Sequence, residues 1–331
     1  MMNLKKSWSK SNDNYKMKYF NKKNFKTISK LIQKRGLIFL LVFLMIVSSF
    51  LSGILFEKVT ALRESESIDI TQTAENNGEL VKLQNKVIKD KYVFKIKWAD
   101  LGKRMVEDGV IDKVKLAQAV VGGDDLPKDL NKYFEGEEKQ IELNQENAQF
   151  WVDVLWGLGL ANKNKILEEG EMMAEGDASG FASTGGWTLG TNEDAMNYYS
   201  KYSYIPLSEK QQKVVEEIAG SIYRPCCGNS TAFPDCNHGM AMLGLIELMV
   251  SQGKSKGEIY KTALAFNTYW FPQTYLDAAL YLQKNGKDYE KISSKELLSE
   301  NFSSTMGSQT ISEEAGGVQW PALGSGGSCG A

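Results

Sequence analysis

The chain has 331 residues, of which 42% are apolar and 24% are charged, and this balance is typical of a folded protein and excludes a disordered one. Residues 1–35 contain eleven lysines and arginines and one acidic residue, whereas the rest of the chain contains 28 basic and 40 acidic residues. An acidic body argues against nucleic acid as a partner, because phosphate binding requires a basic surface.

The first predicted element is a transmembrane helix over residues 36–56, which are 21 residues without a charge. A helix of that length crosses a hydrocarbon core of about 30 Å. The basic arm, residues 1–35, places the N-terminus in the cytoplasm and the body outside it. The alternative is a cleaved signal peptide, because Val59-Thr60-Ala61 resembles a cleavage site. We expect a single-pass protein of the cell membrane, with the lipid bilayer and another extracytoplasmic or membrane protein as partners.

The body is predicted to be mainly α-helical, an irregular multi-helix bundle over residues 79–302 that follows a polar stalk over residues 57–78. Boxes in which Ser or Thr is followed three residues later by an acidic residue or Gln predict helix starts. These boxes begin at Thr191, Ser208, Ser255 and Ser293 and predict helices over 192–203, 209–223, 255–267 and after 293.

The remaining segments are predicted to be strand, turns, loop or tail. Residues 92–98 alternate weakly and allow one strand, and residues 122–145 are rich in turn formers. Glycine-rich residues 176–190 predict a loop, with a backbone anion cradle as the alternative. Residues 303–331 are rich in Gly and Ser, so we expect a flexible tail that carries Cys329.

Three of the four cysteines and the only histidine lie within thirteen residues: Cys226, Cys227, Cys236 and His238. Pro225 stops the preceding helix, and an apolar helix begins near His238 and extends to about residue 252. The start of that helix stabilises a thiolate, the form of cysteine that binds metals and attacks disulfides. We therefore expect the four side chains to converge in one site.

Three interpretations of this cluster stay open. As a metal site, three sulfurs and one imidazole form a tetrahedral set for zinc or a soft set for copper. Met240 and Met242 could add thioethers to a copper site, but we expect both to be core residues. As a thiol–disulfide site, Cys236 pairs with Cys226 or Cys227, and the remaining cysteine attacks. The third interpretation is one structural disulfide with a buried leftover cysteine, in a scaffold of a membrane complex.

Residues 211–264 resemble the thiol-oxidoreductase of cytochrome c maturation, a membrane-anchored family. The matching runs are IYRPCC and DCNHGMAMLGLIELMVSQGKSKGEI. The resemblance implies three helices with reactive cysteines in the first turn, although Cys226 and Cys227 are adjacent here and Cys236 and His238 are additional. The segments WVDVLWGLGLANKNKIL and FASTGGWTLG resemble a bacterial membrane-anchored family and imply no activity.

Overall fold

The structure is a computed structural model that describes residues 70–137 and 139–320. The chain divides into two compact units, Met1–Ala74 and Glu75–Ala331, and the elements below belong to the second unit apart from the start of the first helix. The predicted membrane segment, residues 36–56, and Cys329 lie outside the described residues. Among the described helices, none has the length and hydropathy needed to cross a membrane.

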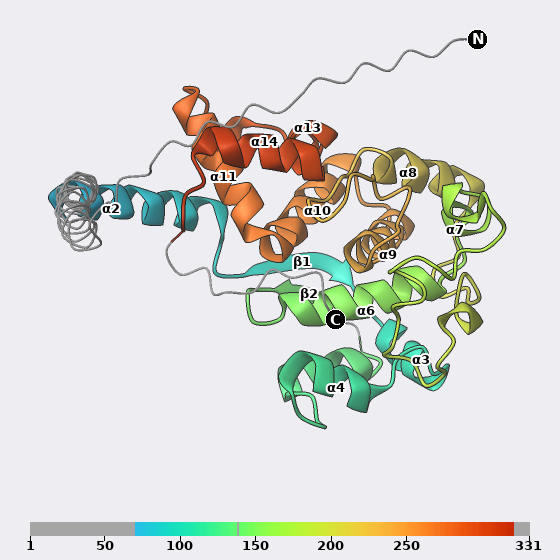
Figure 1. The fold of residues 1–331 in the computed structure, drawn as a ribbon. Helices are drawn as coiled ribbons and strands as arrows, with labels where there is room; N and C mark the ends of the chain where they lie inside the picture. Colours follow the sequence, from blue (N-terminus) through green and yellow to red (C-terminus); the bar gives the residue numbers. More distant parts are fainter. Residues whose placement is uncertain (1–69, 138, 321–331) are drawn as a thin grey trace, which may run out of the picture. The chain divides into compact units, whose positions relative to one another are not determined.

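The described part of the chain is mainly helical, as predicted, and contains one two-stranded sheet (Figure 1). The elements in chain order, with η for short 3₁₀ helices, are α2 (Ile70–Val87), β1 (Tyr92–Lys97), α3 (Leu101–Glu107), α4 (Lys113–Val121), α5 (Lys128–Asn131), η1 (Lys132–Phe134), β2 (Gln140–Leu143), α6 (Ala148–Ala161), α7 (Lys165–Glu168), η2 (Glu171–Met173), η3 (Ala195–Asn197), α8 (Glu209–Ala219), α9 (Asn237–Ser251), α10 (Lys256–Trp270), α11 (Pro272–Lys284), η4 (Tyr289–Lys291), α12 (Ser294–Leu297), α13 (Glu300–Ser303) and α14 (Thr305–Ala315).

The core is built around α6 and α9, two helices with buried residues on almost every side. A Cβ atom on Gly244 of α9 would lie 2.6 Å from the backbone oxygen of Leu155 on α6, so the two backbones touch where they cross. Figure 1 shows α3 and α4 on one side of α6 and the α8–α11 helices on the other. This packing fixes α9, which carries the cysteine segment at its N-terminus.

Three of the four predicted helix starts form, and the side chain of Ser208, Ser255 or Ser293 caps each helix. Ser208 and Ser255 both make complete capping boxes, with Gln211 and Glu258 respectively, at the starts of α8 and α10. The prediction of a helix over residues 192–203 was wrong, because only the three-residue 3₁₀ helix η3 forms there.

The sheet joins two segments that are about 45 residues apart in the sequence. The predicted strand over residues 92–98 is confirmed as β1, and it pairs antiparallel with β2, as in Phe94 opposite Ile141. Strand β2 lies in the stretch that turn formers had predicted to be irregular. Its four residues form a strand because β1 supplies the backbone partners.

Two predicted boundaries need correction. The polar stalk was expected to extend to residue 78, but α2 begins at Ile70. The flexible tail was expected to begin at residue 303, but α14 follows, and the Ser304 side chain caps it by accepting from the Gly307 N–H. The Trp320 indole N–H donates to the buried Asp277 carboxylate over 2.8 Å. This bond attaches the segment after α14 to α11.

Candidate metal centre

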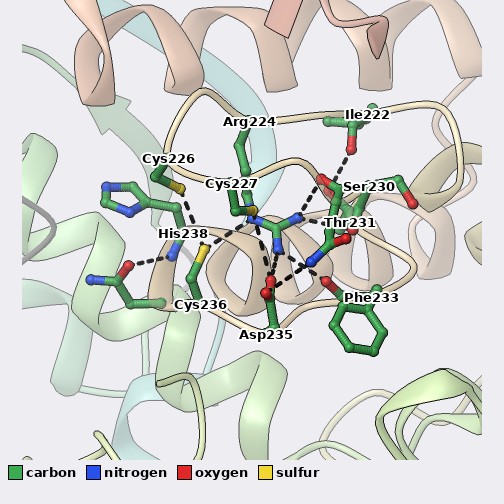
Figure 2. Close-up of polar contacts among 12 residues, drawn as sticks. Ile222, Arg224, Cys226, Cys227, Ser230, Thr231, Phe233, Asp235, Cys236 and His238 are labelled. Carbon is green, nitrogen blue, oxygen red and sulfur yellow. Dashed lines mark hydrogen bonds and ion pairs between the residues drawn. The ribbon is translucent and has the colours of Figure 1, made fainter. Parts of the chain in front are cut away.

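The cysteine segment is a closed loop between α8 and α9 (Figure 2). Tyr223 and Ser230 pair in an isolated antiparallel bridge, and the Thr231 N–H donates to the Ile222 carbonyl over 2.8 Å. Cys236 ends the loop as the N-cap residue of α9, so its predicted place at a helix N-terminus is confirmed. The fold-back therefore brings Cys236 beside cysteines about ten residues earlier in the chain.

Three sulfurs meet in this loop. The Sγ atoms of Cys226, Cys227 and Cys236 all lie within 4.8 Å of one another. Those of Cys226 and Cys236 are 3.4 Å apart, and the three half-buried cysteines form no disulfide within the described part of the chain. This part of the predicted site is present, and it is a cluster that could hold a metal ion.

A buried arginine organises the loop around the sulfurs. The Arg224 side chain is 2% exposed, and its Nε–H donates to the Cys236 Sγ over 2.9 Å. Nη1 donates to the carbonyls of Asn229 and Ser230 over 3.1 Å and 2.9 Å. Nη2 donates to the carbonyl of Phe233 over 2.9 Å and also pairs with the Asp235 carboxylate. The five N–H groups of the guanidinium therefore have five acceptors, all within one loop.

The Asp235 carboxylate completes this hydrogen-bond network. It accepts from the Asn229 side-chain amide over 2.9 Å, and the Cys227 Sγ lies 3.7 Å from it. Sequence reasoning assigned neither Arg224 nor Asp235 to the site. Their positions in the sequence could have indicated a role in the site. Arg224 comes two residues before Cys226, and Asp235 comes directly before Cys236.

The loop favours one thiolate, on Cys236. Hydrogen bonds from the thiols of Cys226 and Cys227 lower the pKa of Cys236 most, and the charge of Arg224 lowers it further against the effect of burial. Hydrogen bonds with Cys227 and Cys236, together with burial, raise the pKa of Cys226. The N-terminus of α9 adds to the preference for negative charge at Cys236.

His238 does not join the three sulfurs, which corrects the expected four-donor geometry. Its ring packs against the rings of Phe271 and Trp270, with centroids 4.5 Å and 5.6 Å away. Its Nδ1 atom is buried and has no hydrogen-bond partner among the described residues, and burial lowers the pKa of His238 to about 4. The imidazole is therefore neutral and lies in an aromatic pocket beside the site.

The other candidates that the sequence suggested, two methionines and the glycine-rich segment, contribute to the packing of the fold. Met240 and Met242 are buried in the hydrophobic core. The glycine-rich segment 176–190 is irregular, as predicted, and it packs on the cysteine loop, because the Ser183 N–H donates to the Asp235 carbonyl over 3.1 Å.

The sulfur positions fit a thiophilic metal ion. Zinc–sulfur bonds of about 2.3 Å place the sulfurs of a tetrahedral ion about 3.8 Å apart. The three cysteines, with one pair at 3.4 Å and all pairs within 4.8 Å, need only small movements to reach that spacing. Cys226, Cys227 and Cys236 would hold the ion.

Comparisons of the chain with protein-family models, curated proteins and solved structures found no match. The order of α8, the cysteine loop, α9 and α10 corresponds to the three-helix layout that the resemblance over residues 211–264 implies. That resemblance stays a prediction.

Proposed function

We propose that this protein is a membrane-anchored, extracytoplasmic protein that binds one soft metal ion through Cys226, Cys227 and Cys236. The observation that carries the proposal is the convergence of three sulfurs within 4.8 Å. Cysteine thiolates select zinc, copper(I) and similar ions over magnesium or calcium. The half-buried position of the three cysteines leaves the site open to an ion from solution.

Charge supports zinc before copper(I). Arg224 and Asp235 form an ion pair with no net charge, so they do not change the total charge of the site. Three thiolates around a divalent ion leave a net charge of minus one, whereas a monovalent ion leaves minus two. A larger uncompensated charge in a half-buried loop is less stable. Met240 and Met242 are buried in the core, so their thioethers do not add soft ligands that would favour copper.

Elemental analysis tests the proposal. The full-length chain is purified anaerobically in detergent, incubated with zinc or copper(I), and separated from free metal. We expect about one metal ion per chain, lost when Cys226, Cys227 or Cys236 is replaced by Ser. Cys329→Ser is the matched control and should keep the ion. A metal-free wild-type chain, or full occupancy in Cys236→Ser, would contradict the proposal.

A thiol–disulfide function is the second candidate, and the 3.4 Å separation of the Cys226 and Cys236 sulfurs favours it. The Cys236 thiolate would attack one sulfur of a partner disulfide, and the other partner sulfur would leave as a thiolate. After losing its proton, Cys226 would then attack the Cys236 sulfur of the mixed disulfide. The second partner sulfur leaves as a thiolate, which gives a Cys226–Cys236 disulfide and a reduced partner. The protein is oxidised by two electrons, and the partner is reduced by two.

Mass-spectrometric thiol counting separates the two functions. A redox protein should lose two free thiols after treatment with a small disulfide, and the new bond should join Cys226 to Cys236. Stoichiometric metal should protect these thiols if metal binding is the function. Free thiols that neither react with the disulfide nor bind metal would contradict both candidates.

The membrane location is proposed from the sequence, because residues 36–56 form an uncharged apolar run behind a basic arm. Alkaline extraction of membranes should leave the chain in the pellet. A protease added outside intact cells or spheroplasts should cleave the body. Release into the soluble fraction, or protection of the body from that protease, would contradict the anchor or its orientation.

A further inference from the structure

Gly239 lies on the first turn of α9, three residues after Cys236, and it faces Arg224. A Cβ atom at this position would lie 2.5 Å from the Cζ of Arg224, 2.6 Å from Nη2 and 2.7 Å from Nε. Side-chain carbons do not approach other heavy atoms this closely, so any residue larger than glycine must displace the guanidinium.

The guanidinium has no easy alternative position. Its N–H groups are bonded to Cys236, Asp235 and three backbone carbonyls of the same loop. A displacement would leave several of these half-buried acceptors without a donor, which is costly. It would also break the contact between Nε and the Cys236 Sγ.

Gly239 differs in this respect from the other close-packed glycine of α9. The three nearest neighbours of a Cβ atom on Gly239 all belong to the Arg224 side chain, whereas those of Gly244 are backbone atoms of α6. Gly244 allows two helices to cross. Gly239 allows one charged side chain to dock beside a sulfur.

We infer that Gly239 is a positioning residue of the three-sulfur site and that it acts through Arg224. By leaving space for the guanidinium, Gly239 lets Arg224 hold the loop closed and fix the Cys236 sulfur near those of Cys226 and Cys227. The inference rests on the proposed metal site and extends it from three cysteines to a unit of three cysteines, one arginine and one glycine.

A double-mutant cycle on the full-length chain tests this. Gly239→Ala, Arg224→Met and the double variant are titrated with cobalt(II), and the thiolate-to-cobalt absorption band reports binding. Each single variant should weaken affinity by about 10- to 100-fold, the usual effect of losing a group that orients a ligand. The double variant should bind within about twofold of Arg224→Met, because a Met side chain has no hydrogen bonds to hold it against the new methyl group.

Gly228→Ala is the matched control, because Gly228 lies in the same loop and a Cβ atom there would have no atom of the described residues within 4 Å. It should bind cobalt(II) like the wild type. Wild-type affinity in Gly239→Ala would overturn the inference and leave the metal site standing. An equal loss from Gly239→Ala in the Arg224→Met background would overturn the dependence on Arg224.

A second readout does not depend on metal. Hydrogen exchange of the Arg224 Nε–H, followed by NMR in metal-free protein, reports whether the guanidinium is docked. Exchange should be at least about tenfold faster in Gly239→Ala than in the wild type, and unchanged in Gly228→Ala. If the wild type binds no cobalt, the metal proposal fails. Unchanged exchange in Gly239→Ala would then overturn the role of Gly239 as well.

Discussion

The Nε atom of Arg224 lies 2.9 Å from the Sγ atom of Cys236, and this contact joins the two ends of the cysteine loop. A permanently charged donor at that distance favours a thiolate. The same guanidinium binds three loop carbonyls and Asp235, so the charge that favours the thiolate also holds the loop closed.

Replacing Arg224 by Met should destabilise the protein without any metal present. The substitution leaves the Asp235 carboxylate and three carbonyls without their donor, and losing one partner of a buried pair costs about 3 kcal/mol or more. Urea unfolding with chelator measures the free energy of unfolding. Arg104→Met is the control, because Arg104 donates to two backbone carbonyls from a more exposed position. A loss below about 1 kcal/mol from Arg224→Met would show that the network is not stabilising.

His238 should make stability depend on pH. Burial lowers the pKa of His238 from 6.5 to about 4, so the folded state favours the neutral ring. This contribution is fully present above pH 6.5 and is lost as the pH falls from 6.5 toward 4. Between pH 7.5 and pH 5, metal-free wild type should lose about 2 kcal/mol more than His238→Phe. Equal losses in the two proteins would show that His238 is not buried as a neutral ring.

The same variant tests whether the imidazole is a ligand. His238 packs against Phe271 and Trp270 and lies outside the sulfur cluster, so a phenyl ring should fit its pocket. We expect His238→Phe to bind metal at wild-type stoichiometry, measured by elemental analysis beside Cys236→Ser. Complete loss of metal in a folded His238→Phe protein would restore the four-donor set that the sequence suggested.

Close helix contact should make Gly159 intolerant of substitution. A Cβ atom there would meet the backbone oxygen of Met240 on α9, so Gly159→Ala must push the two core helices apart. Overpacking of this kind costs about 1–3 kcal/mol. Gly257→Ala on α10, where a Cβ atom would meet no atom of the described residues within 4 Å, should stabilise the fold by up to about 1 kcal/mol. Thermal unfolding that ranks the two variants in the opposite order would contradict the observed crossing.

Local signals in the sequence predicted the parts of the site that depend on nearby residues. Pro225 and the apolar run after Cys236 correctly indicated a loop followed by a helix N-terminus. The failure at His238 has a geometric cause. Cys236 is the extended N-cap residue of α9, whereas the His238 ring packs against Phe271 and Trp270, which come from a later part of the chain.

Other features depend on contacts that no sequence pattern indicates. Arg224 is buried only because the carbonyls of Asn229, Ser230 and Phe233 converge on it, and no local pattern encodes that convergence. Strand β2 is four residues long and needs β1 as a partner. Gly and Ser composition suggested a tail after residue 303, although Ser304 acts there as a helix cap.

X-ray absorption spectroscopy of the zinc-loaded full-length protein tests the central claim most directly. Three cysteine ligands predict three sulfur scatterers at about 2.3 Å from the zinc, with a lighter atom in the remaining position. Cys329→Ser should give the same spectrum, and Cys227→Ser should lose one sulfur scatterer or the ion itself. A first shell of nitrogen and oxygen alone in the wild-type protein would contradict the three-sulfur site.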